Sequence, residues 1–223
     1  MSASPPSGQL AWADDVPGWL VTLADAARGL TARDLSRLEP PAEGGRESAV
    51  LVLFGEGVDG PDVLLIERSR TLRHHAGQVA FPGGERDSAD DSAITTALRE
   101  AVEETGLLPG GVEVLLQLPT LWLPPSGFLV VPVLAWWREP SAVAAADAAE
   151  VAAVVRMPIA RLVEPANRFR LRHPSGYIGA AFEVDGLLVW GFTAGLLDRL
   201  LDAGRLARPW NRDDVRDRPP TAW

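Results

Sequence analysis

Three glutamates fall within five positions of one short segment, at Glu100, Glu103 and Glu104. Each residue of an α-helix advances about 100°, so Glu103 lies about 60° from Glu100 on one side and Glu104 about 40° on the other. The carboxylates therefore share one narrow stripe, where like charges repel and helix stability alone does not favour them. A hard cation with oxygen ligands, Mg2+ or Mn2+, converts this repulsion into binding, so we predict a divalent metal site.

The residues around the glutamates predict where this helix begins and ends. A glycine pair precedes a helix over residues 92–105, and Gly106 stands where a helix should stop. Arg99 can pair with Glu103 at i,i+4. The opposite side of the helix is expected to face the core, with Ile94, Leu98, Ala101 and Val102. The alternative is a solvated acidic face without a metal, but several separate features agree on the metal site.

The rest of the chain predicts strands with helices inserted between them. Short apolar runs bounded by turn residues indicate strands near residues 49–54, 63–67, 78–81, 112–118, 128–137, 150–155, 169–172, 181–184 and 187–190. Further helices are expected near residues 17–30, 31–38, 158–163 and 192–203. Because strands and helices do not alternate regularly, the fold class is expected to be an α+β sandwich rather than a doubly wound parallel sheet.

Composition limits the class of protein. A chain of 223 residues with 47% hydrophobic content can bury one substantial core. We place it in residues 48–205, between an N-terminal extension with short helices (1–47) and an extended C-terminal tail (206–223). The net charge of −9 argues against nucleic-acid binding, and the absence of cysteine excludes disulfides and thiolate sites. With no secretion signal and no apolar stretch long enough for a bilayer, we expect a cytoplasmic protein that does not bind membranes.

The segment from Gly84 to Leu107 resembles the Nudix box, Gly-x5-Glu-x7-Arg-Glu-apolar-x-Glu-Glu-x-Gly-apolar. The second half of the pattern matches at every position from Arg99 onward. In the first half, one extra residue lies between Gly84 and Arg99, and an aspartate replaces the internal glutamate. Asp90 keeps the spacing to Gly84, whereas Asp91 keeps the spacing to Arg99, so both are candidates. A helix cap is the alternative role for this aspartate.

A second motif lies directly before the box. Residues 64–84 contain an Arg-Ser, a Leu-Arg, a histidine and a Gly-Gln that run into Phe-Pro-Gly-Gly. They resemble the motif of the coenzyme A pyrophosphatase branch of Nudix hydrolases, and segments at 126–128, 132–133 and 190–193 are also similar to that branch. The resemblance implies a Nudix α/β/α sandwich with a mixed β-sheet. It implies metal-dependent hydrolysis of coenzyme A, or of its acyl or oxidised forms, to 3′,5′-ADP and 4′-phosphopantetheine.

The same resemblance gives roles to individual residues. Glu100, Glu103 and Glu104 are expected to hold Mg2+ or Mn2+, and Arg99 is expected to orient a glutamate. Guanidinium groups suit phosphate geometry, although a solvated loop is the alternative for any single arginine. The expected substrate-binding residues are a polar run and the glycine turn that follows it: Arg68, Arg70, Arg73, His75, Gln78, Gly83 and Gly84.

Three questions stay open at this level. The general base is Glu100, a carboxylate on a later loop such as Asp147 or Glu150, or no side chain at all if a metal-bound water suffices. The substrate is coenzyme A or another small nucleoside diphosphate derivative, such as ADP-ribose, a dinucleotide or a nucleoside triphosphate. A non-catalytic module that binds such a ligand is the third alternative. The tryptophan-bearing C-terminal strands serve either the core or the surface of a homodimer.

Overall fold

The computed structural model describes residues 15–42, 44–72, 75–124 and 126–217. Its α-helices are α1 (Gly18–Arg28), α2 (Ala32–Leu35), α3 (Ala93–Thr105), α4 (Ile159–Leu162) and α5 (Gly191–Ala203). Its strands are β1 (Arg46–Gly57), β2 (Gly60–Arg68), β3 (Val79–Ala80), β4 (Gly83–Glu85), β5 (Val112–Gln117), β6 (Leu121–Leu123), β7 (Phe128–Trp137), β8 (Val151–Pro158), β9 (Arg168–Arg172), β10 (Ile178–Val184), β11 (Leu187–Val189) and β12 (Val215–Asp217).

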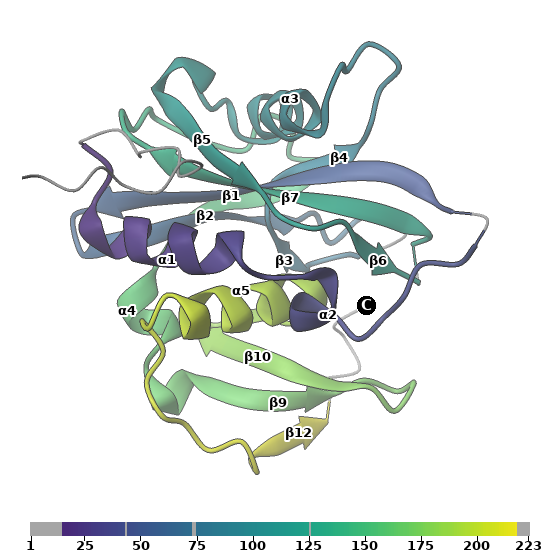
Figure 1. The fold of residues 1–223 in the computed structure, drawn as a ribbon, viewed down its shortest axis with the longest axis vertical. Helices are drawn as coiled ribbons and strands as arrows, with labels where there is room; N and C mark the ends of the chain where they lie inside the picture. The colour runs from purple at the N-terminus through teal and green to yellow at the C-terminus, as the bar shows by residue number, and fades with distance from the viewer. Residues whose placement is uncertain (1–14, 43, 73–74, 125, 218–223) are drawn as a thin grey trace, which may run out of the picture.

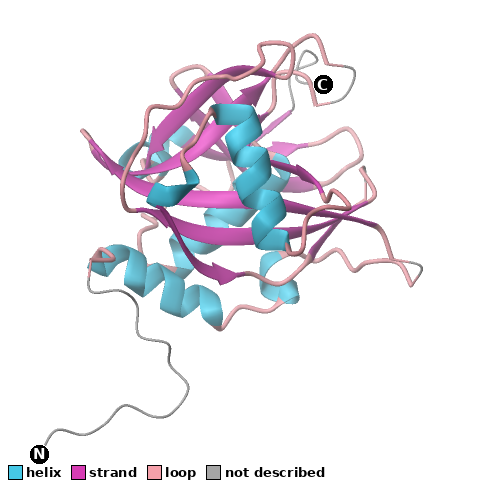
Figure 2. Cartoon of the chain, turned by 90° about the horizontal axis from the view of Figure 1, so that it is seen from above, coloured by secondary structure: helices cyan, strands magenta, loops and turns pink. Residues whose placement is uncertain are grey.

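The layers are arranged around one mixed sheet of eight strands. Helix α3 covers one face of this sheet, and α1 and α5 cover the other (Figure 1). Figure 2 views the molecule from the α3 side and shows this helix lying across the strands. A smaller sheet of four strands, β11-β10-β9-β12, packs on the far side of α5. The expected α/β/α sandwich with a mixed sheet is confirmed.

Strand β1 is central in the main sheet, whose order is β3-β2-β1-β7-β5. It runs parallel to β7, from Arg46 beside Phe128 to Phe54 beside Trp136. Strand β4 pairs with β1, β6 with β7 and β8 with β2, all antiparallel. Because helices cover both faces, β1 and β7 are apolar on both sides instead of alternating with polar residues.

The two faces of the sheet belong to two hydrophobic clusters. Against α3, the cluster includes the fully buried Leu51, Leu53, Leu64 and Trp137. Against α1 and α5, it is larger and includes Val52, Phe54, Leu20, Leu23, Leu197 and Leu200. None of the helices within the described ranges is long and apolar enough to cross a membrane.

Most of the predicted elements are present, and three short strands were not predicted. Strand β4 contains the glycine pair that we interpreted as a turn. A Cβ at Gly83 would lie 2.6 Å from the Val50 Cα, so the close pairing of β4 with β1 requires glycine there. Strand β6 ends directly before Pro124 and pairs with β7, and β12 lies in the charged tail, where it pairs in parallel with β9.

Candidate active site

Helix α3 begins and ends at the capping residues that the sequence indicates. The Ser92 hydroxyl accepts a hydrogen bond from the Thr95 N–H at 3.2 Å and so caps the first turn. Gly106 adopts the left-handed conformation, with φ 67°, and donates its N–H to the Val102 carbonyl. These local contacts set where α3 begins and ends.

The side of α3 that faces the sheet differs in part from the predicted side. Ala101 is fully buried as expected, but Val102 is 37% exposed, whereas Glu104 is only 6% exposed. The prediction was wrong for Val102 because it placed the core-facing side opposite all three glutamates, whereas Glu104 itself is buried. Glu104 is held there by the backbone N–H of Gly83 in strand β4.

Glu104 points at Gly83 and Arg68. The Gly83 N–H donates to its Oε2 at 2.9 Å, and Arg68 Nη1 lies 3.6 Å from its Oε1. Burial raises the pKa of Glu104 to about 7, and the negative charges of Glu100 and Glu150 add to this effect. The Gly83 hydrogen bond and the Arg68 charge act in the opposite direction.

Glu100 lies one helical turn before Glu104 and packs directly on Gly84. A Cβ at position 84 would lie 2.5 Å from the carboxyl carbon of Glu100, so any larger residue there would displace this carboxylate. Burial also raises the pKa of Glu100, while the neighbouring Arg99 lowers it. The glycine pair therefore receives the two most buried glutamates of the helix, one on each residue.

Arg99 connects three carboxylates. Its Nη1 donates to Glu100 Oε1 and to Glu103 Oε2, both at 2.9 Å, so the predicted i,i+4 pair is confirmed. Its Nη2 donates to Asp90 Oδ2 at 2.9 Å. The side chain of Glu103 is 58% exposed, so Arg99 holds it at the surface end of the cluster, away from Glu104.

Asp90, not Asp91, occupies the internal acidic position of the box. Its side chain is buried and accepts the Asp87 N–H at 2.9 Å as well as the Arg99 guanidinium. Arg99 holds the pKa of Asp90 well below its usual range. Asp91 instead accepts a hydrogen bond from the Thr95 hydroxyl at the start of α3. The extra residue is therefore accommodated between Asp90 and Arg99, at the helix N-terminus.

The polar run ahead of the box reaches the glutamates through Arg68. The Nε of Arg68 is buried and has no hydrogen-bond partner among the described residues. Arg70 is 84% exposed and lies 3.3 Å from Glu67. His75 Nδ1 and Gln78 Oε1 are 2.9 Å apart. Arg73, the remaining arginine predicted to bind substrate, lies outside the described residues.

The loop between β7 and β8 brings Glu150 towards Glu104. The Ala146 N–H donates to the Glu104 carbonyl at 3.2 Å, and the Ser69 N–H donates to the Glu150 carbonyl at 2.8 Å. Glu150 is exposed and close enough for its charge to raise the pKa of Glu104. Asp147, the other carboxylate considered as a base, closes a turn, since its Oδ1 accepts a backbone N–H two residues on at 2.8 Å.

The chemistry of this donor set fits a divalent cation. Glu100 and Glu104 offer carboxylate oxygens, the ligands that Mg2+ and Mn2+ prefer. Burial disfavours the anions of both residues, and a bound cation would offset that cost. Within the described ranges, no three acidic or histidine side chains gather around one point. Glu100 and Glu104 are therefore the inner pair, and Glu103 lies at the exposed edge.

Comparison with known proteins shows the family. A sequence model of the NUDIX domain matches residues 45–176. The chain is 39% identical over 160 residues to an uncharacterized Nudix hydrolase, NudL, of Escherichia coli strain K12. It is 41% identical over 160 residues to the protein of the same name from Citrobacter koseri. Both alignments cover 70% of this chain and 81% of the relative.

The matched domain model and the relatives named Nudix hydrolase show that this chain, whose helix α3 places two glutamates against the glycine pair of β4, is a diphosphatase, an enzyme that hydrolyses phosphoanhydrides. The chain belongs to the Nudix hydrolase family, whose members act on nucleoside diphosphate derivatives and generally use divalent metals such as Mg2+ or Mn2+. A solved Nudix hydrolase from Nitrosomonas europaea shares the fold, with a TM-score of 0.50 and 13% identity over 78% of this chain and 80% of that one.

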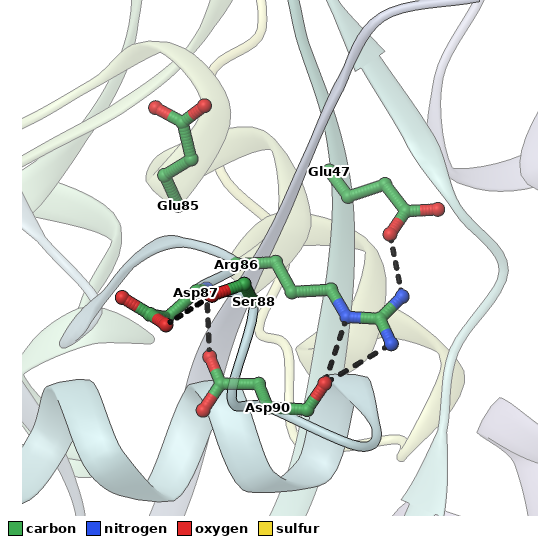
Figure 3. A pocket seen from close by; sticks show the side chains of 6 residues that line it. All are labelled: Glu47, Glu85, Arg86, Asp87, Ser88 and Asp90. Carbon is green, nitrogen blue, oxygen red and sulfur yellow. Dashed lines mark hydrogen bonds and ion pairs between the residues drawn. The ribbon is translucent and has the colours of Figure 1, made fainter.

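One residue of the site was not singled out from the sequence. Arg86 lies in the loop between β4 and α3, and its Nε and Nη2 donate to the Asp90 carbonyl at 3.2 and 3.1 Å (Figure 3). An arginine among acidic loop residues is typical of a solvated surface, so no pattern in one sequence distinguishes it. Only the contact with Asp90 shows that it belongs to the site.

Proposed function

We propose that this Nudix hydrolase cleaves the pyrophosphate of coenzyme A, or of an acyl or oxidised form. The products are 3′,5′-ADP and 4′-phosphopantetheine or its acylated counterpart. The observation that carries the proposal is the 3.6 Å approach of Arg68 Nη1 to Glu104 Oε1. Arg68 belongs to the run that resembles the coenzyme A pyrophosphatase motif, and Glu104 belongs to the Nudix box. The contact brings both motifs to one site.

Arg68 has the properties of a phosphate ligand. Its side chain is 31% exposed, and its ion pair with Glu104, at 3.6 Å, is longer than a hydrogen bond, so guanidinium donors remain for a substrate oxygen. Arg70 is held only loosely by Glu67 and is mostly exposed. Coenzyme A carries a 3′-phosphate besides its diphosphate, and more than one guanidinium is suited to such a ligand. His75, Gln78 and Arg73 belong to the same run and complete the proposed binding set.

Glu100 and Glu104 are the proposed ligands of Mg2+ or Mn2+, with Glu103 beside them and Arg99 orienting Glu100. A cation held there would neutralise charge on the diphosphate and lower the pKa of a water molecule. Gly83 and Gly84 are proposed to contact the substrate through their backbone, since the lack of side chains lets this backbone lie against β1 and Glu100 at the site. The burial and contacts of Glu100 and Glu104 on the same side of α3 support these proposed roles.

Glu150 is the proposed general base among the carboxylates that we considered. It is exposed and lies near Glu104, whereas the Asp147 carboxylate is engaged by a backbone N–H. The carbonyl of Glu150 is bound by the N–H of Ser69, next to Arg68. A base in this position would take a proton from a water on the side of the site that faces the phosphate-binding run.

Product analysis by mass spectrometry tests the proposal. Coenzyme A incubated with the protein and Mg2+ or Mn2+ at mildly alkaline pH should give 3′,5′-ADP and 4′-phosphopantetheine. Coenzyme A that lacks its 3′-phosphate should react poorly. If coenzyme A stays intact while ADP-ribose, a dinucleotide or a nucleoside triphosphate is hydrolysed, coenzyme A is rejected as the substrate but the Nudix activity is not. If no compound of the panel is hydrolysed, the result favours the alternative of a non-catalytic module that binds such a ligand.

A further inference from the structure

We propose that Arg86 is a positioning residue that holds the loop before α3 in the form that the carboxylate site needs. The inference rests on the metal-ligand roles proposed above for Glu100 and Glu104. It concerns residues 86–92, which connect β4 to α3. This segment contains the one residue that is extra relative to the spacing of the Nudix box. Arg86 is the one basic residue of this segment, whose other members are acidic or small. An open pocket is lined by Glu47, Glu85, Arg86, Asp87, Ser88 and Asp90 (Figure 3).

Arg86 connects this loop to Glu47 of β1 on one side and to Asp90 of the same loop on the other. Its Nη1 donates to Glu47 Oε2 at 2.6 Å, and its backbone N–H donates to the Glu47 carbonyl at 2.9 Å. On the other side, Nε and Nη2 both donate to the Asp90 carbonyl, at 3.2 and 3.1 Å. Figure 3 shows the guanidinium between Glu47 and Asp90.

The Asp90 carbonyl is an effective point to hold. The Asp90 N–H donates to the Asp87 carbonyl at 3.0 Å, and the Asp87 N–H donates to Asp90 Oδ2 at 2.9 Å. With Arg86 on its carbonyl, all polar groups of Asp90 are engaged, and its peptide cannot turn without breaking them. The side chain of Asp90 is thereby directed at Arg99.

A chain of contacts then leads to the metal-ligand candidates. Arg86 fixes Asp90, Asp90 fixes Arg99 at 2.9 Å, and Arg99 fixes Glu100 at 2.9 Å. Loop-closure entropy grows slowly with length, so the extra residue of this loop costs little stability. Without the hydrogen bonds from Arg86, the Asp90 carbonyl would lose its partner and the position of Asp90 would be less well defined. Residues that orient metal ligands in this indirect way affect both metal binding and rate.

The two ends of Arg86 are not equivalent. The Glu47 side chain is 64% exposed and that of Arg86 39%, so their ion pair is screened by solvent and contributes little. The hydrogen bonds to the Asp90 carbonyl are partly buried. The positioning effect is therefore assigned to the Asp90 end, and this separates Arg86 from an ordinary surface arginine.

The test compares Arg86→Gln with Glu47→Gln, using Mn2+ alone as the probe. Binding of Mn2+ is followed by electron paramagnetic resonance. The values of kcat and KM are measured with a diphosphate compound that the wild-type protein hydrolyses. Arg86→Gln should raise the Mn2+ dissociation constant about tenfold and lower kcat about tenfold, with KM changed less than about twofold. Amide hydrogen exchange should accelerate at residues 87–90. Glu47→Gln should stay close to the wild type, as should Arg161→Gln, which removes an arginine from a distant surface pair with Asp185.

An Arg86→Gln protein with wild-type Mn2+ affinity, kcat and exchange would overturn the proposal. If that variant does not fold, Arg86→Lys is the deciding variant. A lysine ammonium can donate to the Asp90 carbonyl but cannot reproduce the two hydrogen bonds from Nε and Nη2. A partial loss of Mn2+ affinity then supports the proposal, and wild-type affinity rejects it. Mn2+ binding and exchange need no substrate, so a wild-type protein that leaves coenzyme A intact rejects only the proposed substrate.

Discussion

Arg99 donates to both carboxylate oxygens of Asp90, from Nε to Oδ1 at 3.1 Å and from Nη2 to Oδ2 at 2.9 Å. The same guanidinium uses Nη1 for Glu100 and Glu103. The hydrogen bonds from Arg99 hold the pKa of Asp90 well below its usual range, although burial acts in the opposite direction, so the aspartate stays charged at ordinary pH values. Arg99 is thus anchored on the loop side before it meets the helix glutamates.

Asp90→Asn should therefore lower kcat about 10- to 100-fold while the protein stays folded. The amide keeps one acceptor but loses the charge and turns a donor towards Arg99, so Glu100 loses its fixed partner. Steady-state kinetics with the hydrolysed diphosphate measures the effect. Asp91→Asn is the matched control, because Asp91 contacts Thr95 at the helix start and should change kcat less than about twofold. Equal losses in both variants would contradict the assignment of Asp90.

Glu104→Gln should abolish most of the activity, whereas Glu103→Gln should reduce it only moderately. Glu104 is buried and directed at Gly83, but Glu103 is largely exposed and held by Arg99. Loss of a direct metal ligand removes several kcal/mol of transition-state stabilisation, so we expect a fall of at least about 100-fold for Glu104→Gln. For Glu103→Gln we expect a fall of about tenfold.

The metal readout for these two glutamates is thermal. Added Mn2+ should raise the melting temperature of the wild type and of Glu103→Gln, because a ligand that binds only the native state stabilises it. The melting temperature of Glu104→Gln should not respond to Mn2+. A response equal to that of the wild type would remove Glu104 from the ligand set.

Gly84→Ala should impair catalysis through one methyl group. The added carbon would lie 2.5 Å from the Glu100 carboxyl carbon, so the Glu100 side chain cannot keep its present rotamer. Glu100 must move, and we expect kcat to fall about tenfold or more. Gly195→Ala is the control, since that glycine lies in α5 with open space around its Cβ position. It should leave kcat unchanged and add up to about 1 kcal/mol of stability. Unchanged kcat in Gly84→Ala would contradict the packing argument.

Arg156→Gln should destabilise the protein, and more so at higher pH. Asp62 is 4% exposed, and Arg156 Nε lies 2.8 Å from its Oδ2. Without Arg156 an unpaired carboxylate stays buried, at a cost of about 3 kcal/mol in the free energy of unfolding near neutral pH. Urea unfolding of variant and wild type at several pH values gives this difference.

The sign of the pH effect follows from the pKa of Asp62, which burial raises and Arg156 lowers. Removing Arg156 raises it further above the unfolded value of about 3.9, so the folded variant holds the proton more tightly than the unfolded chain. Stability of the variant relative to the wild type must then fall as the pH rises from about 4. The double variant Asp62→Asn, Arg156→Gln should regain much of the loss. A difference that does not depend on pH would reject this explanation.

The sequence predicted those parts of the fold that depend on local contacts. Helix α3 is delimited by Ser92 and Gly106, which act within one turn of their own positions. The apolar runs predicted the strands of the main sheet because β1 and β7 are buried on both faces. Strand β4 was missed since two glycines have low strand propensity, and its existence depends on pairing with β1.

The candidate site was predictable in its residue types but not in its geometry. The grouping of Glu100, Glu103 and Glu104 follows from helical spacing alone. The burial of Glu104 depends on Gly83 and Arg68, which are distant in sequence, and its depth was not foreseen. The choice between Asp90 and Asp91 likewise required the contact with Arg99. The metal and substrate roles stay predictions for the experiments above.

The NUDIX domain model matches residues 45–176, but the larger hydrophobic cluster also includes residues before and after this range. Leu20 and Leu23 of α1, and Leu197 and Leu200 of α5, are fully buried but lie outside residues 45–176. A recombinant fragment trimmed to those limits would lose both helices from this face of the main sheet and uncover apolar residues such as Phe54, against which Trp19 of α1 packs. The working unit for any laboratory study therefore includes both flanking helices.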